Sequence, residues 1–161
     1  MRELLPITLE EIILNELNGK NDWINLCLNY ELSEEIIEEF SNKLDWDLVS
    51  IHQNLSEKFV EKYSDKFNWH YISIYQKLSE SFIEKFQDKV DWDAISRDQE
   101  LSEDFIDKFA NKINWHLILR SQILSEQFIE KHKNELNNDP LVNHMLFDGH
   151  VIKQIVKHRK L

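Results

Sequence analysis

Apolar and polar residues alternate along this chain with the period of short helices. In residues 55–63 the apolar positions recur three and four residues apart, which places on one side of a helix Leu55, Phe59, Val60 and Tyr63. A second stripe follows at the same helical spacing and consists of Trp69, Ile72, Ser73 and Gln76. Residues 65–68 separate the two stripes without any glycine or proline. The pattern therefore predicts a hairpin of two short helices.

Polar residues stand where each predicted helix begins. Ser56 is suited to cap the first helix, and Glu57 follows it at the positive end of the helix dipole. Asn68 is placed to cap the second helix. Phe67 and Ile72 then occupy the two positions of a hydrophobic staple, which sets the direction in which the chain enters the helix. Both helices thus have a defined start.

The hairpin recurs every 23 residues. This period is marked by five tryptophans, namely Trp23, Trp46, Trp69, Trp92 and Trp115. Four near-copies align without gaps and begin at Leu32, Leu55, Leu78 and Leu101. A weaker unit precedes them, and another follows from Leu124, in which Asn138 replaces the tryptophan. Tandem units with atypical ends are typical of a stacked array with capping repeats.

We therefore predict an all-α fold in which short helical-hairpin repeats stack as a small α-solenoid with capping ends. Helices of about eight residues are too short to be stable alone, so each apolar stripe must be buried against a neighbouring repeat. A ladder of tryptophans is expected in the core. One compact helical bundle is an alternative that the pattern also allows, whereas an all-β fold is excluded because no segment alternates with period two.

The predicted organisation has three parts. Residues 1–31 form a degenerate N-terminal capping repeat, and residues 32–123 form four complete repeats. Residues 124–161 hold a further degenerate repeat and a basic C-terminal helix, which starts near Pro140 and is expected to cap the array.

Each complete repeat carries two motifs, LSExFI and DWxxIS, seen together in LSESFIEKFQDKVDWDAIS from Leu78. Residues 32–131 resemble the short tandem repeats that are abundant in proteins of large DNA viruses and some bacteriophages. This resemblance implies a helical-repeat protein encoded by a virus or a mobile element, without a catalytic motif. It implies no particular function, since such repeats are a scaffold with many uses.

The charge of the chain narrows the classes of partner. Thirty acidic against 19 basic side chains give a formal net charge of −11, which argues against a protein that binds the backbone of DNA or RNA. An acidic surface suits a basic protein partner instead. The charge is uneven, because the four complete repeats carry −5, +1, −4 and 0, whereas residues 149–161 carry +4.

The remaining composition indicates a reducing compartment, and we expect a cytoplasmic location, in the host cell if the protein is viral. The single Cys27 cannot form an internal disulfide, and its apolar neighbours indicate a packed rather than a reactive thiol. No apolar run approaches the roughly 18 residues that span a membrane. We expect a monomer or a homodimer without membrane contact.

No catalytic motif is recognisable, so we predict no enzyme activity, no cofactor and no metal. The best argument for an enzyme is the position after each tryptophan, where aspartate and histidine alternate as Asp47, His70, Asp93 and His116. Pairing of aspartate with histidine across repeats is the interpretation we favour. A metal-dependent enzyme that uses His70, Asp93 and His116 is an alternative. Backbone hydrogen bonding between repeats is expected for the recurrent Gln53, Gln76, Gln99 and Gln122.

Candidate binding residues lie where otherwise similar repeats differ. On the second helix these positions face away from the tryptophan stripe, and solenoids use such continuous faces for binding. Ile51, Tyr71, Ile74 and Tyr75 would form the kind of apolar and aromatic patch found at interface centres. The alternative is that such positions fill space between repeats or face solvent without a role. The predicted partner-binding residues are Asp47, Ile51, His52, His70, Tyr71, Ile74, Tyr75, Asp93, Arg97, Asp98, His116 and Arg120.

We predict a non-catalytic protein-binding repeat module whose partner is a host or viral protein. With the viral resemblance, the leading hypothesis is an effector that binds and inhibits a host defence protein. A sharper form is an acidic surface that mimics nucleic acid in the cleft of a basic nucleic-acid-binding protein, as in an anti-CRISPR inhibitor, with no direct nucleic-acid binding. The alternative is a structural protein whose repeats self-assemble in a viral particle or scaffold.

Overall fold

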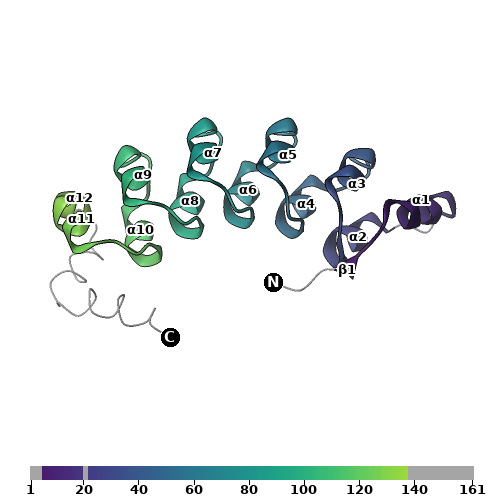
Figure 1. The fold of residues 1–161 in the computed structure, drawn as a ribbon, viewed down its shortest axis with the longest axis horizontal. Helices are drawn as coiled ribbons and strands as arrows, with labels where there is room; N and C mark the ends of the chain where they lie inside the picture. Colours follow the sequence, from purple (N-terminus) through teal and green to yellow (C-terminus); the bar gives the residue numbers. More distant parts are fainter. Residues whose placement is uncertain (1–4, 20–21, 138–161) are drawn as a thin grey trace. The chain divides into compact units, whose positions relative to one another are not determined.

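The computed structural model describes residues 5–19 and 22–137, and these residues form a succession of short helices (Figure 1). The helices are α1 Leu9–Leu17, α2 Trp23–Asn29, α3 Glu34–Glu39, α4 Trp46–His52, α5 Glu57–Lys62, α6 Trp69–Tyr75, α7 Glu80–Lys85, α8 Trp92–Asp98, α9 Glu103–Lys108, α10 Trp115–Ser121, α11 Glu126–Lys131 and α12 Lys133–Asn137. The predicted all-α repeat fold is confirmed. The predicted C-terminal helix from Pro140 lies outside the described residues.

A two-residue parallel strand pair, which the sequence pattern did not predict, joins the N-terminal segment to the first repeat. Strand β1, Leu5–Pro6, pairs with strand β2, Tyr30–Glu31, with Leu5 opposite Tyr30. Strand β2 directly follows α2. The pair therefore attaches the start of the chain to the turn that leaves the second helix of the capping repeat.

The contacts divide the chain into two compact units, which we call unit 1, Met1–Val90, and unit 2, Asp91–Leu161. In unit 1, α4 packs between α2 and α6, and these second helices form one row while α3, α5 and α7 form another (Figure 1). In unit 2, α10 packs against α8 and α12. Successive repeats thus stack within each unit, as predicted.

The predicted caps are present at each hairpin and explain how such short helices begin. A serine side chain accepts a hydrogen bond from the backbone N–H three residues later at Ser33, Ser56, Ser79, Ser102 and Ser125. At the start of the second helices, a side-chain oxygen accepts from a backbone N–H two or three residues later, at Asp22, Asp45, Asn68, Asp91 and Asn114. These side chains satisfy backbone donors that a helix start leaves without intrahelical partners.

The core consists of aliphatic and phenylalanine side chains at fixed repeat positions. Ile72 is completely buried on α6, and Phe67, its partner in the predicted staple, is buried before the helix. The fourth residue of the first helix is completely buried in all four complete repeats. These residues are Ile37, Val60, Ile83 and Ile106. Burying such side chains against the next repeat supplies the stability that six- and seven-residue helices lack on their own.

The tryptophans differ from the prediction of a buried ladder. All five are only half-buried, and each ring packs on aromatic side chains of the following repeat. The Trp46 ring lies 5.3 Å from that of Tyr63 and 4.9 Å from that of Phe67. Its Nε1–H donates to the Ser41 carbonyl at 3.0 Å. Because this donor must reach a loop carbonyl, the ring stays at the edge of the interface between successive repeats.

Lysine side chains lie over the tryptophan rings. Lys66 Nζ is 4.9 Å from the centroid of Trp46, and Lys89 stands over Trp69 in the same way. The lysine belongs to the repeat that follows the tryptophan, so the cation–π contact joins two repeats. The apolar part of the lysine side chain thereby covers the exposed edge of the interface between these two repeats, and the lysine charge lies in solvent.

Within each unit a buried glutamine joins one repeat to the one before it, as predicted for Gln53, Gln76 and Gln122. Gln76 Nε2 donates to the carbonyls of Ser50 and Gln53, at 2.7 and 2.8 Å, and its Oε1 accepts from Leu55 N–H at 3.0 Å. Gln53 makes the same three bonds one repeat earlier, and Gln122 makes them in unit 2. Three backbone groups of each turn thus depend on one side chain.

Carboxylates also connect successive repeats along the first helices. Glu34 accepts a hydrogen bond from the backbone N–H of Ser56, and Glu57 does the same for Ser79. Glu38 pairs with Lys62 at 2.5 Å, as does Glu61 with Lys85; in unit 2, corresponding contacts join Glu103 to Ser125 and Asp107 to Lys131. Several of the acidic side chains therefore belong to the repeat scaffold.

Replacing Gln76 by leucine should lower the free energy of unfolding by about 2–4 kcal/mol, because three buried backbone groups lose their hydrogen bonds. Urea denaturation followed by circular dichroism measures this change. Lys77→Leu, at the exposed next position, is the matched control and should change stability by less than about 0.5 kcal/mol. Equal unfolding midpoints for the two variants would contradict a structural role for this glutamine.

Stability should fall at acidic pH through the carboxylates that join repeats. The hydrogen bond from Lys62 holds the pKa of Glu38 below its usual range. Since the folded-state pKa is lowered, the contribution is present above the unfolded-state pKa and is lost as pH falls, between about pH 5 and 3. The thermal midpoint of Glu38→Gln should therefore lie below that of the wild type at pH 7 and approach it at pH 3. Glu39→Gln, on the same helix, should show a smaller difference, and a pH-independent gap for Glu38→Gln would contradict this assignment.

Candidate interaction surface

The second helix of each complete repeat has one face that points away from its buried side chains. On α6, Ile72, Ser73 and Gln76 are buried, so His70 and Ile74 point to the opposite side. The same holds for the two equivalent positions, one and five residues after the tryptophan, in the other complete repeats. All twelve predicted partner-binding residues are at least partly exposed. The structure thus leaves the predicted positions accessible in both units.

In unit 1 this face is apolar and aromatic. The predicted Ile51 and Ile74 are half-buried, and Tyr75 is 48% exposed. The rings of Tyr71 and Tyr75 lie 6.3 Å apart on α6, and the ring of His70 lies 5.7 Å from that of Tyr71. Three predicted residues of α6 are therefore brought together. Of the other two in this unit, Asp47 is exposed and His52 half-buried, both on α4.

Two residues of the capping repeat extend the surface and were missing from the predicted set. Ile24 and Leu28, on α2, are 59% and 36% exposed. They hold the positions of Asp47 and Ile51 one repeat earlier, and α2 packs beside α4 (Figure 1). The 23-residue register could have identified them, but the degenerate sequence of residues 1–31 concealed it. We call Ile24, Leu28, Ile51, Tyr71, Ile74 and Tyr75 the apolar stripe.

In unit 2 the equivalent face carries charge. Arg97 takes the position of Ile74, and its guanidinium binds the Asp98 carboxylate at 2.9–3.1 Å. This contact, with smaller contributions from Asp91 and Asp93, raises the pKa of Arg97. Arg120 approaches His116, with 3.5 Å between Nη1 and Nε2. This face therefore presents apolar contacts in unit 1, and an Arg97–Asp98 ion pair and an Arg120–His116 contact in unit 2.

Asp93 makes a contact other than the predicted pairing of aspartate with histidine. Its carboxylate accepts a hydrogen bond from Asn114 Nδ2, 2.8 Å away. Asn114 is the residue that caps α10, so Asp93 contributes to the start of the next repeat's second helix. The aspartate that directly follows the tryptophan therefore serves the repeat scaffold at Asp93.

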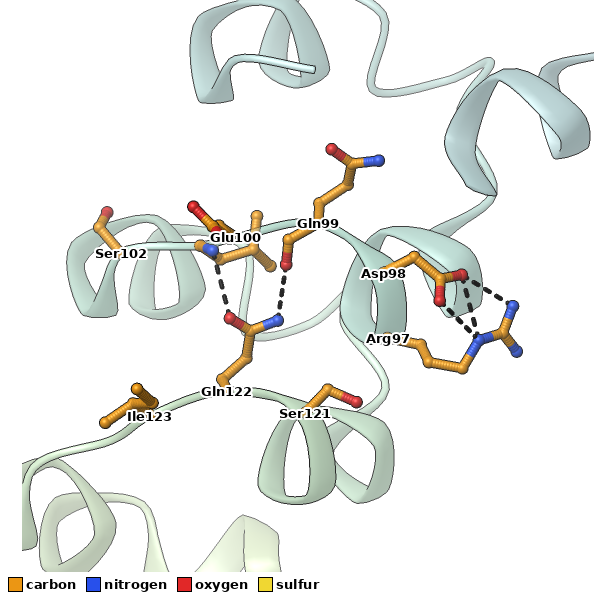
Figure 2. A pocket seen from close by; sticks show the side chains of 9 residues that line it. Arg97, Asp98, Gln99, Glu100, Ser102, Ser121, Gln122 and Ile123 are labelled. Carbon is orange, nitrogen blue, oxygen red and sulfur yellow. Dashed lines mark hydrogen bonds and ion pairs between the residues drawn. The ribbon is translucent and has the colours of Figure 1, made fainter. Parts of the chain in front are cut away.

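A groove of about 600 Å³ lies in unit 2 beside the turns that follow α8 and α10 (Figure 2). Its lining residues are Arg97, Asp98, Gln99, Glu100, Leu101, Ser102, Ser121, Gln122 and Ile123. Gln122 holds its base together by bonding Gln99 O at 2.7 Å and Leu101 N–H at 3.2 Å. The Arg97–Asp98 pair and the 67% exposed Ile123 stand on its walls (Figure 2). The nine residues include neither histidine nor cysteine, and they offer charge and hydrogen bonds to a ligand.

Comparison of the chain with protein-family models, with curated proteins and with solved structures finds no match. The properties of the surface must therefore be argued from its own residues. Among residues 5–19 and 22–137, no group of three histidine, cysteine, aspartate or glutamate side chains is arranged to hold a metal ion. No helix in the same part of the chain has the length and apolar character needed to cross a bilayer.

Cys27 is part of the scaffold and not of this surface. It is completely buried at the repeat position that Ser50, Ser73 and Ser96 hold elsewhere. Burial raises the pKa of its thiol to about 11, and the nearby charge of Asp45 adds to this increase. Because the thiolate is the reactive form, the native thiol is protected both by access and by protonation.

Cys27 should react with thiol reagents much more slowly in the native protein than in the unfolded chain, by about 100-fold or more at pH 8. The rate of colour release from an aromatic disulfide reagent measures this in buffer and in concentrated urea. Raising the pH to 9 should leave the native rate low, because the pKa of the thiol stays above that value. A native rate close to that of the unfolded chain would contradict the burial of this side chain.

Proposed function

We propose that this chain is a non-catalytic protein-binding module that contacts its partner through the outward face of its second helices. One observation carries the proposal: residues that recur in every repeat are bonded inside the scaffold, whereas those that differ between repeats are accessible. Gln76 and Ser56 exemplify the first group, and Tyr75 and Arg97 exemplify the second. A stacked scaffold tolerates change at positions that do not hold repeats together, and such faces serve as extended binding surfaces.

The proposal includes a role as a viral effector that binds and inhibits a host defence protein. Its support is the resemblance of residues 32–131 to viral tandem repeats and the net charge of −11. An acidic surface favours a basic partner such as a nucleic-acid-binding protein, because complementary charge accelerates and orients association. Nucleic-acid mimicry has narrower support, since Glu34 and Glu38 already serve contacts between repeats.

Site-specific photo-crosslinking tests the binding face. The exposed Tyr75 on α6 is replaced by p-benzoylphenylalanine in one full-length variant, and the exposed Lys58 on α5 is replaced in the control. In lysates of candidate host cells, the Tyr75 variant should form a distinct crosslinked species that the Lys58 variant does not form. Mass spectrometry identifies the protein in that species.

The outcomes separate the functional classes. Loss of the crosslink in about 0.5 M salt or with excess nucleic acid supports a basic nucleic-acid-binding partner, because surface charge is screened at that salt concentration. Crosslinks between copies of this chain would support the structural, self-assembling alternative instead. The same crosslinked proteins from both variants, or none from either, would contradict binding through the second-helix face.

A further inference from the structure

The apolar stripe of unit 1 is more hydrophobic than an end repeat requires. A terminal repeat of a solenoid normally presents a polar outer face to solvent. Here the capping repeat exposes Ile24 and Leu28. Leu28 has the register of Ile51 and Ile74 in the next two repeats, and Ile24 lies four residues before it on α2. Since α2, α4 and α6 pack side by side, the aliphatic positions form a row across three helices (Figure 1).

Acidic side chains outnumber basic ones around this row, in which Lys77 is exposed just after α6. Helices α2, α4 and α6 contain no lysine or arginine, as their sequences show. Carboxylates border the row instead: Asp47 is exposed on α4, Asp22 and Asp45 are exposed where α2 and α4 begin, and Glu31 is exposed just after α2. An apolar row within an acidic border is complementary to an apolar row within a basic border.

We propose that the apolar stripe binds a basic amphipathic helix of a partner protein. Packed helices lie about 8–10 Å apart, so equivalent side chains on α2, α4 and α6 recur at about that distance. Seven residues of a helix advance about 10.5 Å, so a helix that crosses the row can place one apolar side chain of each heptad against each repeat. Tyr71 and Tyr75 form an aromatic contact at one end of the row, and Asp47 receives a lysine or arginine beside it.

This inference rests on the proposed function, because it identifies the class of partner for the same face in unit 1. It departs from nucleic-acid mimicry in one respect. A mimic of DNA or RNA presents regularly spaced negative charge, whereas Ile24, Leu28, Ile51 and Ile74 present aliphatic surface. Apolar contact supplies the binding free energy, and the carboxylates select a cationic partner.

A synthetic amphipathic peptide serves as the probe. It has about 21 residues, enough to cross three helices, with leucine on one face and lysine on the other. The labelled peptide is titrated with the full-length protein, and fluorescence anisotropy reports binding. A scrambled peptide of the same composition and a peptide with glutamate in place of lysine are the controls. We expect binding of the amphipathic basic peptide only, weakened several-fold when salt rises from about 0.05 to 0.5 M.

Two variants with the same added charge locate the site. Ile24→Lys disrupts the stripe, whereas Ile123→Lys changes an aliphatic residue of similar exposure in unit 2, 67% against 59%. Ile24→Lys should weaken binding by about tenfold or more, and Ile123→Lys by less than about twofold. Circular dichroism confirms that both variants remain folded, as expected for exposed positions.

Equal affinities for the two variants, or equal binding of the scrambled peptide, would overturn the inference. So would a concentration-dependent dimer that Ile24→Lys abolishes, because the occupant would then be a second copy of the chain. A Tyr75 crosslink to a protein without a basic amphipathic helix would overturn this inference and leave the proposed function intact. Absence of any Tyr75-specific crosslink would count against the proposed function itself.

Discussion

The buried glutamine of each repeat satisfies backbone groups at the point where one hairpin passes into the next. Helices of six or seven residues leave most of their terminal N–H and C=O groups without intrahelical partners. Gln76 bonds two carbonyls of the preceding repeat and one N–H of its own repeat, all in a buried position. Only a side chain with both a donor and an acceptor can bridge these groups. The turn therefore needs neither glycine nor regular pairing, and the register of 23 residues is tied to that one amide.

The need to satisfy backbone groups between repeats also accounts for some of the acidic residues. Glu34 completes the start of the next repeat by accepting the N–H of Ser56, and Glu38 pairs with Lys62 one turn further on. These bonds recur in both units, so each unit holds carboxylates that serve the scaffold whether or not a partner is basic. The exposed Asp47 on α4 lies outside this set. The net charge of the chain is accordingly a weaker guide to function than its distribution over the second helices.

Features that depend on residues within one repeat could be predicted from the sequence. Serine and asparagine caps and the glutamine that bonds the turn all follow from spacing along the chain, and the structure confirms them at Ser56, Asn68 and Gln76. The half-exposed tryptophans could not be foreseen, because their position depends on which loop carbonyl the indole N–H reaches. Ile24 and Leu28 belong to the surface only through the packing of α2 beside α4, a relation between repeats that the degenerate first unit obscures.

Near the ends of the described array, scaffold positions accept a different residue where its shape and bonding suit the site. Cys27 fills the buried place of a serine, and His132 fills that of the aromatic residues Tyr63 and Phe109. The His132 ring packs 4.8 Å from Trp115, and its Nε2 lies 2.9 Å from the Asp107 carboxylate. Inward positions are therefore constrained by volume and hydrogen bonding. Outward positions such as Ile74 and Arg97 occupy one register and hold an aliphatic side chain in one repeat and a charged one in another. The difference between isoleucine and arginine there changes the chemistry of the surface, while Gln76 and Gln122 make the same bonds between repeats in the two units.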